Sequence, residues 1–191
     1  MYCSQKFIVL TVIGGCRGLH LTVNLTLPSL LPGENRQYGG DVPILVAHCC
    51  TIISIYAPTM TNSPENIDGF YDQLNQTLRG IPGSDKIILM GDFNARVGND
   101  YSTWKNVVGK FGTGNANSNG ERLLNLCSEF QLAITNTCFK HKLAHKTSWM
   151  HPRSKHWHLI DYIITRQRDL KDIHDTRAMR GADCNTDHIM I

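Results

Sequence analysis

The segment from residue 51 to residue 90 constrains the fold most, because two kinds of hydrophobic pattern alternate along it. Thr51–Tyr56 and Lys86–Met90 are short, nearly continuous apolar runs, as found in buried strands. Between them, Ser63 and Pro64 supply the start of a helix and Gly80 supplies its end. This predicted helix has one apolar face, formed by Ile67, Phe70, Tyr71, Leu74 and Leu78.

The alternation of strands and helices continues along the chain. A second helix is predicted over Glu121–Phe130, with inward-facing Leu123, Leu124, Cys127 and Phe130. Further strands are predicted at Ile44–Ala47, Leu132–Thr137, Lys146–Trp149 and Leu159–Ile164. Residues 95–120 are rich in Gly and Asn, and an irregular segment of that length is usually functional or mobile. Strands interleaved with helices indicate an α/β or α+β fold.

Length and cysteine usage limit the class of protein further. A chain of 191 residues is long enough for one domain with a substantial core. Its seven cysteines are irregularly spaced without a C-x-x-C pair, which favours reduced thiols over a zinc ribbon or a disulfide framework. The apolar run at 7–16 is too short to span a bilayer, and a signal-peptide core and a buried strand explain it equally well. We expect a nuclear or cytoplasmic protein with no membrane partner.

Three acidic residues stand at strand ends or in loops, where α/β enzymes commonly carry their chemistry. Asp92 follows the 86–90 strand, Asp161 interrupts an apolar run, and Asp187 precedes His188. Each has a plain alternative explanation: an ordinary turn for Asp92, a salt bridge or strand-edge carboxylate for Asp161, and a surface pair for Asp187 with His188. As a set they suit phosphate chemistry, because carboxylates bind hard cations and an imidazole exchanges protons with phosphate oxygens.

Four motifs occur in the order found in one enzyme superfamily. They are Ile55–Thr59 (IYAPT), Gly91–Ala95 (GDFNA), Leu159–Ile163 (LIDYI) and Thr186–His188 (TDH). In these motifs the chain resembles the endonuclease/exonuclease/phosphatase superfamily. It resembles still more closely the endonuclease-like proteins derived from LINE-type retrotransposons, including those named craniofacial development protein 2-like. We therefore expect a poorly matching N-terminal segment over residues 1–40 and a partial domain of this kind over residues 41–191.

The resemblance implies a four-layered α/β sandwich of two packed mixed sheets flanked by helices, here N-terminally truncated. It also implies a phosphodiesterase dependent on Mg²⁺ or Mn²⁺. Asp92 would orient or deprotonate the attacking water, Asn94 would hold Asp92 and the phosphate, and Asp161 would orient His188. His188 would stabilise charge on the phosphorane. The other implied roles are contact with the phosphate or the nucleophile for Tyr56, and metal ligation for Asp92. Asp187 would be a metal ligand or an acid that supports the metal ligands.

One element of the superfamily pattern has no match in the chain. The superfamily carries its main Mg²⁺ ligand, a Glu, on a strand that precedes the tyrosine-bearing strand. Only Glu34 and Asp41 are acidic before Tyr56, and neither lies in a comparable context. The alternatives to an active endonuclease are therefore a catalytically impaired nucleic-acid-binding remnant of the same fold and a phosphatase of the superfamily.

A basic stretch with interleaved aromatics runs from Lys140 to Arg168. Such a stretch suits phosphate contact and base stacking, although solvated loops explain it too. We expect a nucleic-acid partner, DNA in particular, bound by Asn136, Trp149, Arg153, Lys155 and Trp157. His141 and His145 have the spacing of two helical metal ligands, but a third ligand is missing, which argues against zinc. The chain is expected to act as a monomer or with a complementing chain.

Overall fold

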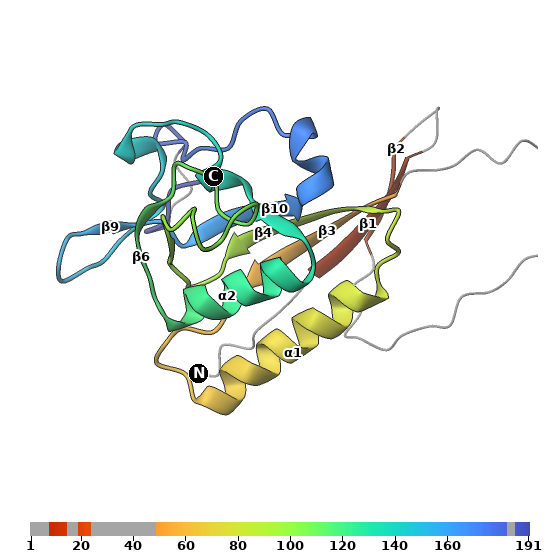
Figure 1. The fold of residues 1–191 in the computed structure, drawn as a ribbon, viewed down its shortest axis with the longest axis horizontal. Coiled ribbons are helices and arrows are strands. Elements are labelled where there is room, and N and C mark those ends of the chain that lie inside the picture. The colour runs from red at the N-terminus through yellow and green to blue at the C-terminus, as the bar shows by residue number, and fades with distance from the viewer. Residues whose placement is uncertain (1–7, 15–18, 24–48, 183–185) are drawn as a thin grey trace, which may run out of the picture.

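The computed structural model describes residues 8–14, 19–23, 49–182 and 186–191, and its centre is one six-stranded sheet (Figure 1). The strand order across the sheet is β2-β1-β3-β4-β10-β7. Strands β3 and β4 are parallel, and the remaining neighbours are antiparallel. The strands are β1 (Ile8–Gly14), β2 (Leu19–Val23), β3 (Cys49–Tyr56), β4 (Lys86–Asp92), β7 (Leu132–Ile134) and β10 (Asp161–Arg166).

Helix α1 (Pro64–Gly80) makes the crossover between the parallel strands β3 and β4. Ser63 caps it by accepting a hydrogen bond from the Asn66 N–H, and the proline lies in its first turn, where a missing N–H costs nothing. The crossover returns the chain so that Tyr56 and Asp92 are register partners at the same end of the sheet. The local sequence signals thus place the ends of both strands side by side.

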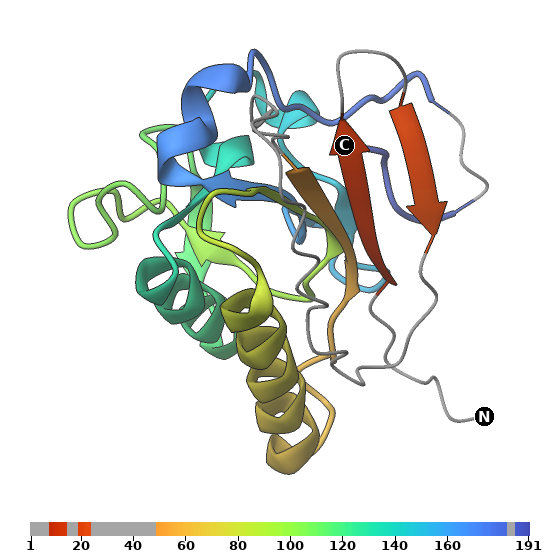
Figure 2. The ribbon, with the colours of Figure 1, turned by 90° about the vertical axis from the view of Figure 1, so that its right-hand side faces the viewer.

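Helix α2 (Ser118–Glu129) lies beside α1 on the same face of the sheet (Figures 1 and 2). The core forms between this helix pair and the sheet, and it is a single cluster of buried apolar side chains. Its members include Ile53, Ile55, Leu74, Ile87, Leu89, Leu123, Leu124, Leu132 and Ile164. The opposite face of the same strands is more open, with Ser54 exposed and Met90 39% accessible. Only one face of the sheet is therefore covered by helices in the described residues.

Short elements fill the connections. Two two-stranded sheets, β5 (Val97–Gly98) with β6 (Thr113–Ala116) and β8 (Trp149–Met150) with β9 (Trp157–His158), lie toward the end of the large sheet where β4 finishes (Figure 1). The 3₁₀ turns are η1 (Thr135–Thr137), η2 (Leu143–His145) and η3 (Gln167–Asp172).

The first helix and the 51–56 and 86–90 strands are confirmed, while other boundaries differ for local reasons. The strand expected through Thr137 ends at Ile134, because the Cys138 N–H bonds back to Thr135 in a 3₁₀ turn. The strand expected over Lys146–Trp149 is wrong up to its last residue, since the N–H groups of Lys146 and Thr147 bond to the Leu143 carbonyl.

Two other boundaries move. The second helix starts earlier than expected, at Ser118, because Asn117 caps it. Strand β10 begins at Asp161 rather than Leu159, since the Ile160 and Asp161 N–H groups both bond to the Ser148 hydroxyl. The segment expected to be irregular, 95–120, includes β5, β6 and the first turn of α2.

The α/β class is confirmed: the described residues combine a mixed sheet with helices packed on it. Of the four expected layers they form one helix layer and one large sheet, together with the two small sheets. Strands β1 and β2 come from the first 40 residues and belong to the large sheet, so the apolar run at 7–16 contains a strand. The predicted strand Ile44–Ala47, together with Glu34 and Asp41, lies outside the described residues. No helix of the described part combines the length and apolarity needed to cross a bilayer.

Candidate active site

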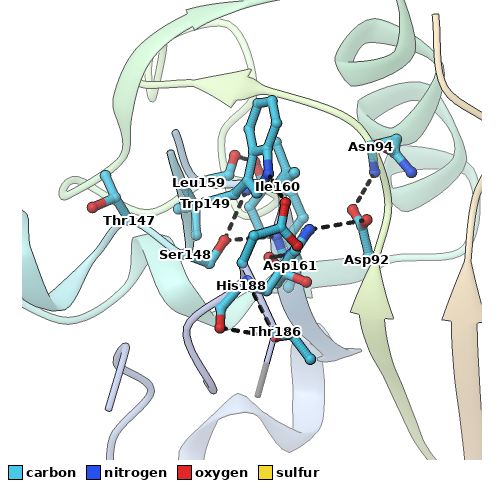
Figure 3. A network of polar contacts seen from close by, with 12 residues as sticks. Asp92, Asn94, Thr147, Ser148, Trp149, Leu159, Ile160, Asp161, Thr186 and His188 are labelled. Atoms are coloured by element: carbon cyan, nitrogen blue, oxygen red, sulfur yellow. Dashed lines mark hydrogen bonds and ion pairs between the residues drawn. The ribbon is translucent and has the colours of Figure 1, made fainter. Parts of the chain in front are cut away.

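Three side chains from distant parts of the chain meet at one end of the sheet (Figure 3). Asp92 is the last residue of β4 and Asp161 the first of β10, and the antiparallel register pairs them directly. His188 comes from the C-terminal segment, which forms a bridge to Trp149 of β8. Metal-ligating atoms of Asp92, Asp161 and His188 lie within 4.8 Å of one another, the one such group among the described residues. A possible acidic metal site is therefore present.

The imidazole of His188 lies between the two carboxylates. Its Nδ1 is 3.0 Å from Asp161 Oδ2, and its Nε2 is 4.0 Å from Asp92 Oδ2. A proton on Nδ1 would donate to Asp161 and fix the ring, which leaves Nε2 directed toward the side of Asp92 (Figure 3). Asp161 therefore orients the imidazole, and the Asp92 carboxylate is not needed for that role.

Partial burial shapes the ionisation of this group. Desolvation raises the pKa of Asp92 to about 6; the Asn94 N–H opposes the rise and the Asp161 carboxylate adds to it. Burial lowers the pKa of His188, but its hydrogen bond to Asp161 and the surrounding carboxylates outweigh this, so the net pKa is raised. The pKa of Asp92 is therefore shifted toward neutral pH, and the His188 imidazole holds its proton more tightly than a free histidine does.

The turn after β4 is held by its own residues. The Asn94 N–H donates to Asp92 Oδ1 at 2.8 Å, and Asn94 Nδ2 donates to the Ala57 carbonyl at 2.9 Å. Asn94 has a φ of 46°, in the left-handed region that Asn tolerates better than most residues. The same turn is tied to β10 by the Phe93 N–H, which bonds to the Ile160 carbonyl. Asn94 thus orients Asp92 and links it to the end of β3.

Ser148 was not anticipated from the sequence, although it holds Asp161 and the segment of His188. Its buried hydroxyl accepts from the Ile160 and Asp161 N–H groups, at 3.3 and 3.2 Å. Its carbonyl accepts from the Ile189 N–H at 2.6 Å. The sequence placed Ser148 in a strand. A lone serine carries no spacing pattern, so only its position next to Trp149 could have indicated a role at the site.

Asp187 and Tyr56 are not members of the three-residue group, but both adjoin it, and the Asp187 carboxylate contributes to the raised pKa values of Asp92 and His188. Asp187 Oδ2 accepts from Trp149 Nε1 at 2.9 Å, and this bond lowers the pKa of Asp187. Tyr56 is the register partner of Asp92, with 48% of its surface exposed. Metal ligation by Asp187 and phosphate contact by Tyr56 stay predictions.

The residues expected to bind nucleic acid divide into two groups. Trp149, Arg153, Lys155 and Trp157 belong to the β8–β9 hairpin, and all but Trp149 are exposed. The Trp149 indole lies among the rings of His151, His158 and His188, so the hairpin reaches the site through this side chain. Asn136 differs, because it is 4% exposed and both ends of its amide bond the backbone of β10. Its side chain supports Asp161 and does not reach the surface.

The structure divides the basic stretch that is continuous in sequence. Arg166 and Arg168 lie at the far end of β10, where both bond the Asp85 carbonyl. That end is roughly 17 Å along the strand from Asp161. His141 pairs with Asp175, and His145 bonds the Ala178 carbonyl, so neither faces the other as a metal ligand pair. The hairpin portion of the stretch reaches the site through Trp149, whereas Arg166 and Arg168 lie at the other end of β10.

Two hollows lie in the region, and they differ in chemistry. One of about 320 Å³ is lined by Asp161 and His188 together with Met90, Ile163 and Ile189. A larger one of about 440 Å³ lies along β5 and β6 beside Trp104, and its lining contains none of the three grouped residues. The smaller hollow borders the ionisable cluster through Asp161 and His188, while Asp92 is not part of its lining.

The fold and the cluster are of the kind found in proteins of the nuclease and phosphatase type. The chain belongs to the Endonuclease-reverse transcriptase family, whose sequence model matches residues 50–191. This places it in the endonuclease/exonuclease/phosphatase superfamily.

Two curated relatives are similar along the whole chain. Craniofacial development protein 2 of Bos taurus is 35% identical, and that of Tragulus javanicus is 33% identical. Both matches cover 100% of this chain but only 31% and 32% of the relatives, so the chain spans about a third of their length. A solved structure, the endonuclease domain of TRAS1, a telomere-specific non-LTR retrotransposon, shares the fold with a TM-score of 0.53. It is 19% identical, and the match covers 75% of this chain and 56% of that one.

Proposed function

We propose that the chain is a divalent-metal-dependent endonuclease, derived from a retroelement, that hydrolyses phosphodiester bonds of DNA. The observation that carries the proposal is the meeting of Asp92, Asp161 and His188 at the sheet end, next to an exposed basic hairpin. The likeness to the TRAS1 endonuclease domain supports the fold of such an enzyme. In-line attack on a phosphodiester needs a base that activates a water and a donor toward the phosphate oxygens. Asp92 can serve as the base and His188 as the donor.

The proposed roles follow from the contacts. Asp92 takes the proton of the attacking water, since it is ionisable near neutral pH and is held by the Asn94 N–H. Protonated His188 donates from Nε2 to a phosphate oxygen, while Asp161 fixes the ring through Nδ1. Mg²⁺ or Mn²⁺, held by carboxylates of Asp92 and Asp187, would supply positive charge for the developing anion. Hard cations such as these prefer oxygen ligands, and the carboxylates of Asp92 and Asp187 offer them.

Metal removal gives the direct test of this function. Purified chain incubated with supercoiled plasmid and Mg²⁺ is expected to produce nicked circles, and excess EDTA is expected to abolish them. Small phosphomonoesters and inositol phosphates are supplied in parallel reactions. Phosphate release with intact plasmid would favour a phosphatase, and salt-sensitive DNA binding without nicking would favour an impaired remnant.

The hairpin should supply part of the DNA affinity. We expect replacement of both Arg153 and Lys155 by Ala to weaken DNA binding about tenfold and to lower the salt slope by about 2, since each phosphate contact releases about 0.9 counterion. The matched control replaces Arg168 and Lys171 on η3, at the far end of β10, with the same charge change. Binding titrations over a range of salt measure both. Equal slopes in the two double variants would remove the hairpin from the interface.

A further inference from the structure

The first turn of α2 contacts the backbone of both loops that carry the proposed site. Asn119 is 1% exposed, and its Nδ2 donates to two carbonyls, that of Pro58 at 3.0 Å and that of Asn94 at 3.1 Å. Pro58 lies just after β3 and Asn94 just after β4. A single buried amide therefore joins the segment after Tyr56 to the segment after Asp92.

Asn117 and Gly120 contact Arg96, two residues further along the same loop. Asn117 Oδ1 accepts from the Arg96 N–H, and the Asn117 N–H donates to the Arg96 carbonyl, both at 3.0 Å. A Cβ on Gly120 would lie 1.7 Å from that carbonyl oxygen, so only glycine permits the contact. The turn 117–120 thus bonds the backbone of the 94–96 segment at two residues, Asn94 and Arg96.

The contacts made by the turn 117–120 are connected to Asp92 through Asn94. Asn94 takes part in three of these bonds: its carbonyl accepts from Asn119, its side chain bonds the Ala57 carbonyl, and its N–H donates to Asp92 Oδ1. Because Asn94 has a left-handed φ of 46°, its peptide needs such support on both sides. Release of its carbonyl would free the N–H that aims the Asp92 carboxylate.

One atom argues that Asn119 is retained for its donors. In the described part of the chain its buried Oδ1 has no hydrogen-bond partner, which costs stability. An apolar side chain of similar size would avoid that cost but would leave the Pro58 and Asn94 carbonyls without their donor. The amide therefore serves the geometry of the two loops better than it serves burial.

We propose that Asn119 is a positioning residue, which sets the orientation of Asn94 and, through it, of Asp92 for phosphodiester hydrolysis. Asn117 and Gly120 support it by fixing the backbone at Arg96. The inference rests on the proposed function for its catalytic consequence, but not for the geometry itself. Asn119 is buried and is not one of the three grouped residues; it acts through Asn94. Misplacement of a reacting group by about 1 Å can lower turnover about 100-fold, which sets the scale of the effect.

The test compares Asn119→Leu with two variants of the same helix. Asn125→Leu makes the same chemical change at an exposed position, and Leu126→Ala destabilises the core away from the loops. Hydrogen exchange is followed for peptides over 57–60 and 91–97, and plasmid nicking is measured with Mg²⁺. For Asn119→Leu we expect faster exchange confined to those peptides, kcat lowered about 10- to 100-fold and KM changed less than about twofold.

The controls separate the outcomes. Asn125→Leu should match the wild type, and Leu126→Ala should lower Tm without selective exchange in 91–97 or a loss of kcat well below Tm. Unchanged exchange over 91–97 in Asn119→Leu, or the same selective change in Leu126→Ala, overturns the positioning role. Faster exchange with an unchanged kcat overturns its catalytic consequence. A wild-type chain that does not nick DNA contradicts the proposed function instead, and the exchange measurement still decides the positioning of the loops.

Discussion

Replacing Asp92 by Asn is expected to reduce plasmid nicking by about 100- to 10,000-fold, the range for loss of a general base. The substituted amide keeps an oxygen for the Asn94 N–H, so the turn retains its hydrogen bond and the loss is chemical. Initial nicking rates with Mg²⁺, at several enzyme concentrations, measure the effect. Asp72→Asn, an exposed carboxylate on α1, is the matched control and should nick as the wild type does.

The Asp92→Asn variant should lose nicking activity but should not lose thermal stability. Burial raises the pKa of Asp92 to about 6 from an ordinary value of 3.8, so ionising this carboxyl costs folding free energy above the ordinary pKa. The cost is about 3 kcal/mol at neutral pH and vanishes below the ordinary pKa, where both states are protonated. Asp92→Asn should therefore equal or exceed the wild-type Tm at neutral pH and converge with it in acid. A variant that loses both stability and nicking would point to a structural role for Asp92.

The second large effect concerns Gly91, just before Asp92. Its φ is +132°, and a Cβ there would lie 2.1 Å from the Ile55 carbonyl oxygen on β3. We expect Gly91→Ala to destabilise the fold by about 3–5 kcal/mol, because backbone strain adds to a clash with a backbone atom that cannot rotate away. Tm should fall by roughly 10 °C or more, as measured by thermal or urea unfolding.

Gly83→Ala is the matched control, since an added Cβ there would meet nothing within 4 Å. That variant should unfold within about 0.5 kcal/mol of the wild type, as surface changes usually do. Comparable stability for Gly91→Ala would show that β3 and β4 can separate at this point. The close approach of the two strands would then not be needed for the site.

Much of the sheet could be predicted because its signals are local. Ser63, Pro64 and the apolar face mark α1 without tertiary information, and Lys86–Met90 is apolar enough to be a buried strand in any context. The motifs also pointed to Asp92, Asp161 and His188 as a set, and the structure brings these three together. The order of motifs along the chain carried that information, since spacing alone allowed an ordinary turn at Asp92.

What could not be predicted depends on hydrogen bonds between distant segments. Thr135–Thr137 and Lys146–Thr147 look like strands in composition. Thr135–Thr137 forms a 3₁₀ turn instead, and the Lys146 and Thr147 N–H groups bond the Leu143 carbonyl. Ser148 and Asn119 are single polar residues without periodicity, and their partners lie at Asp161 and Asn94. Asn136 was assigned to the nucleic-acid surface for the same reason, because nothing local reveals that its amide faces β10.

The antiparallel pairing of Asp161 with Asp92, and the bridge from His188 to Trp149, have a consequence for how activity arises. Neither contact exists until segments far apart in the sequence have found each other, and such long-range contacts form late and slowly. A chain that has formed only its α1 crossover holds Asp92 but lacks both of its companions. Under the proposed function, partly folded molecules therefore do not cleave nucleic acid. Cleavage begins only when the segment that carries His188 has packed against Trp149.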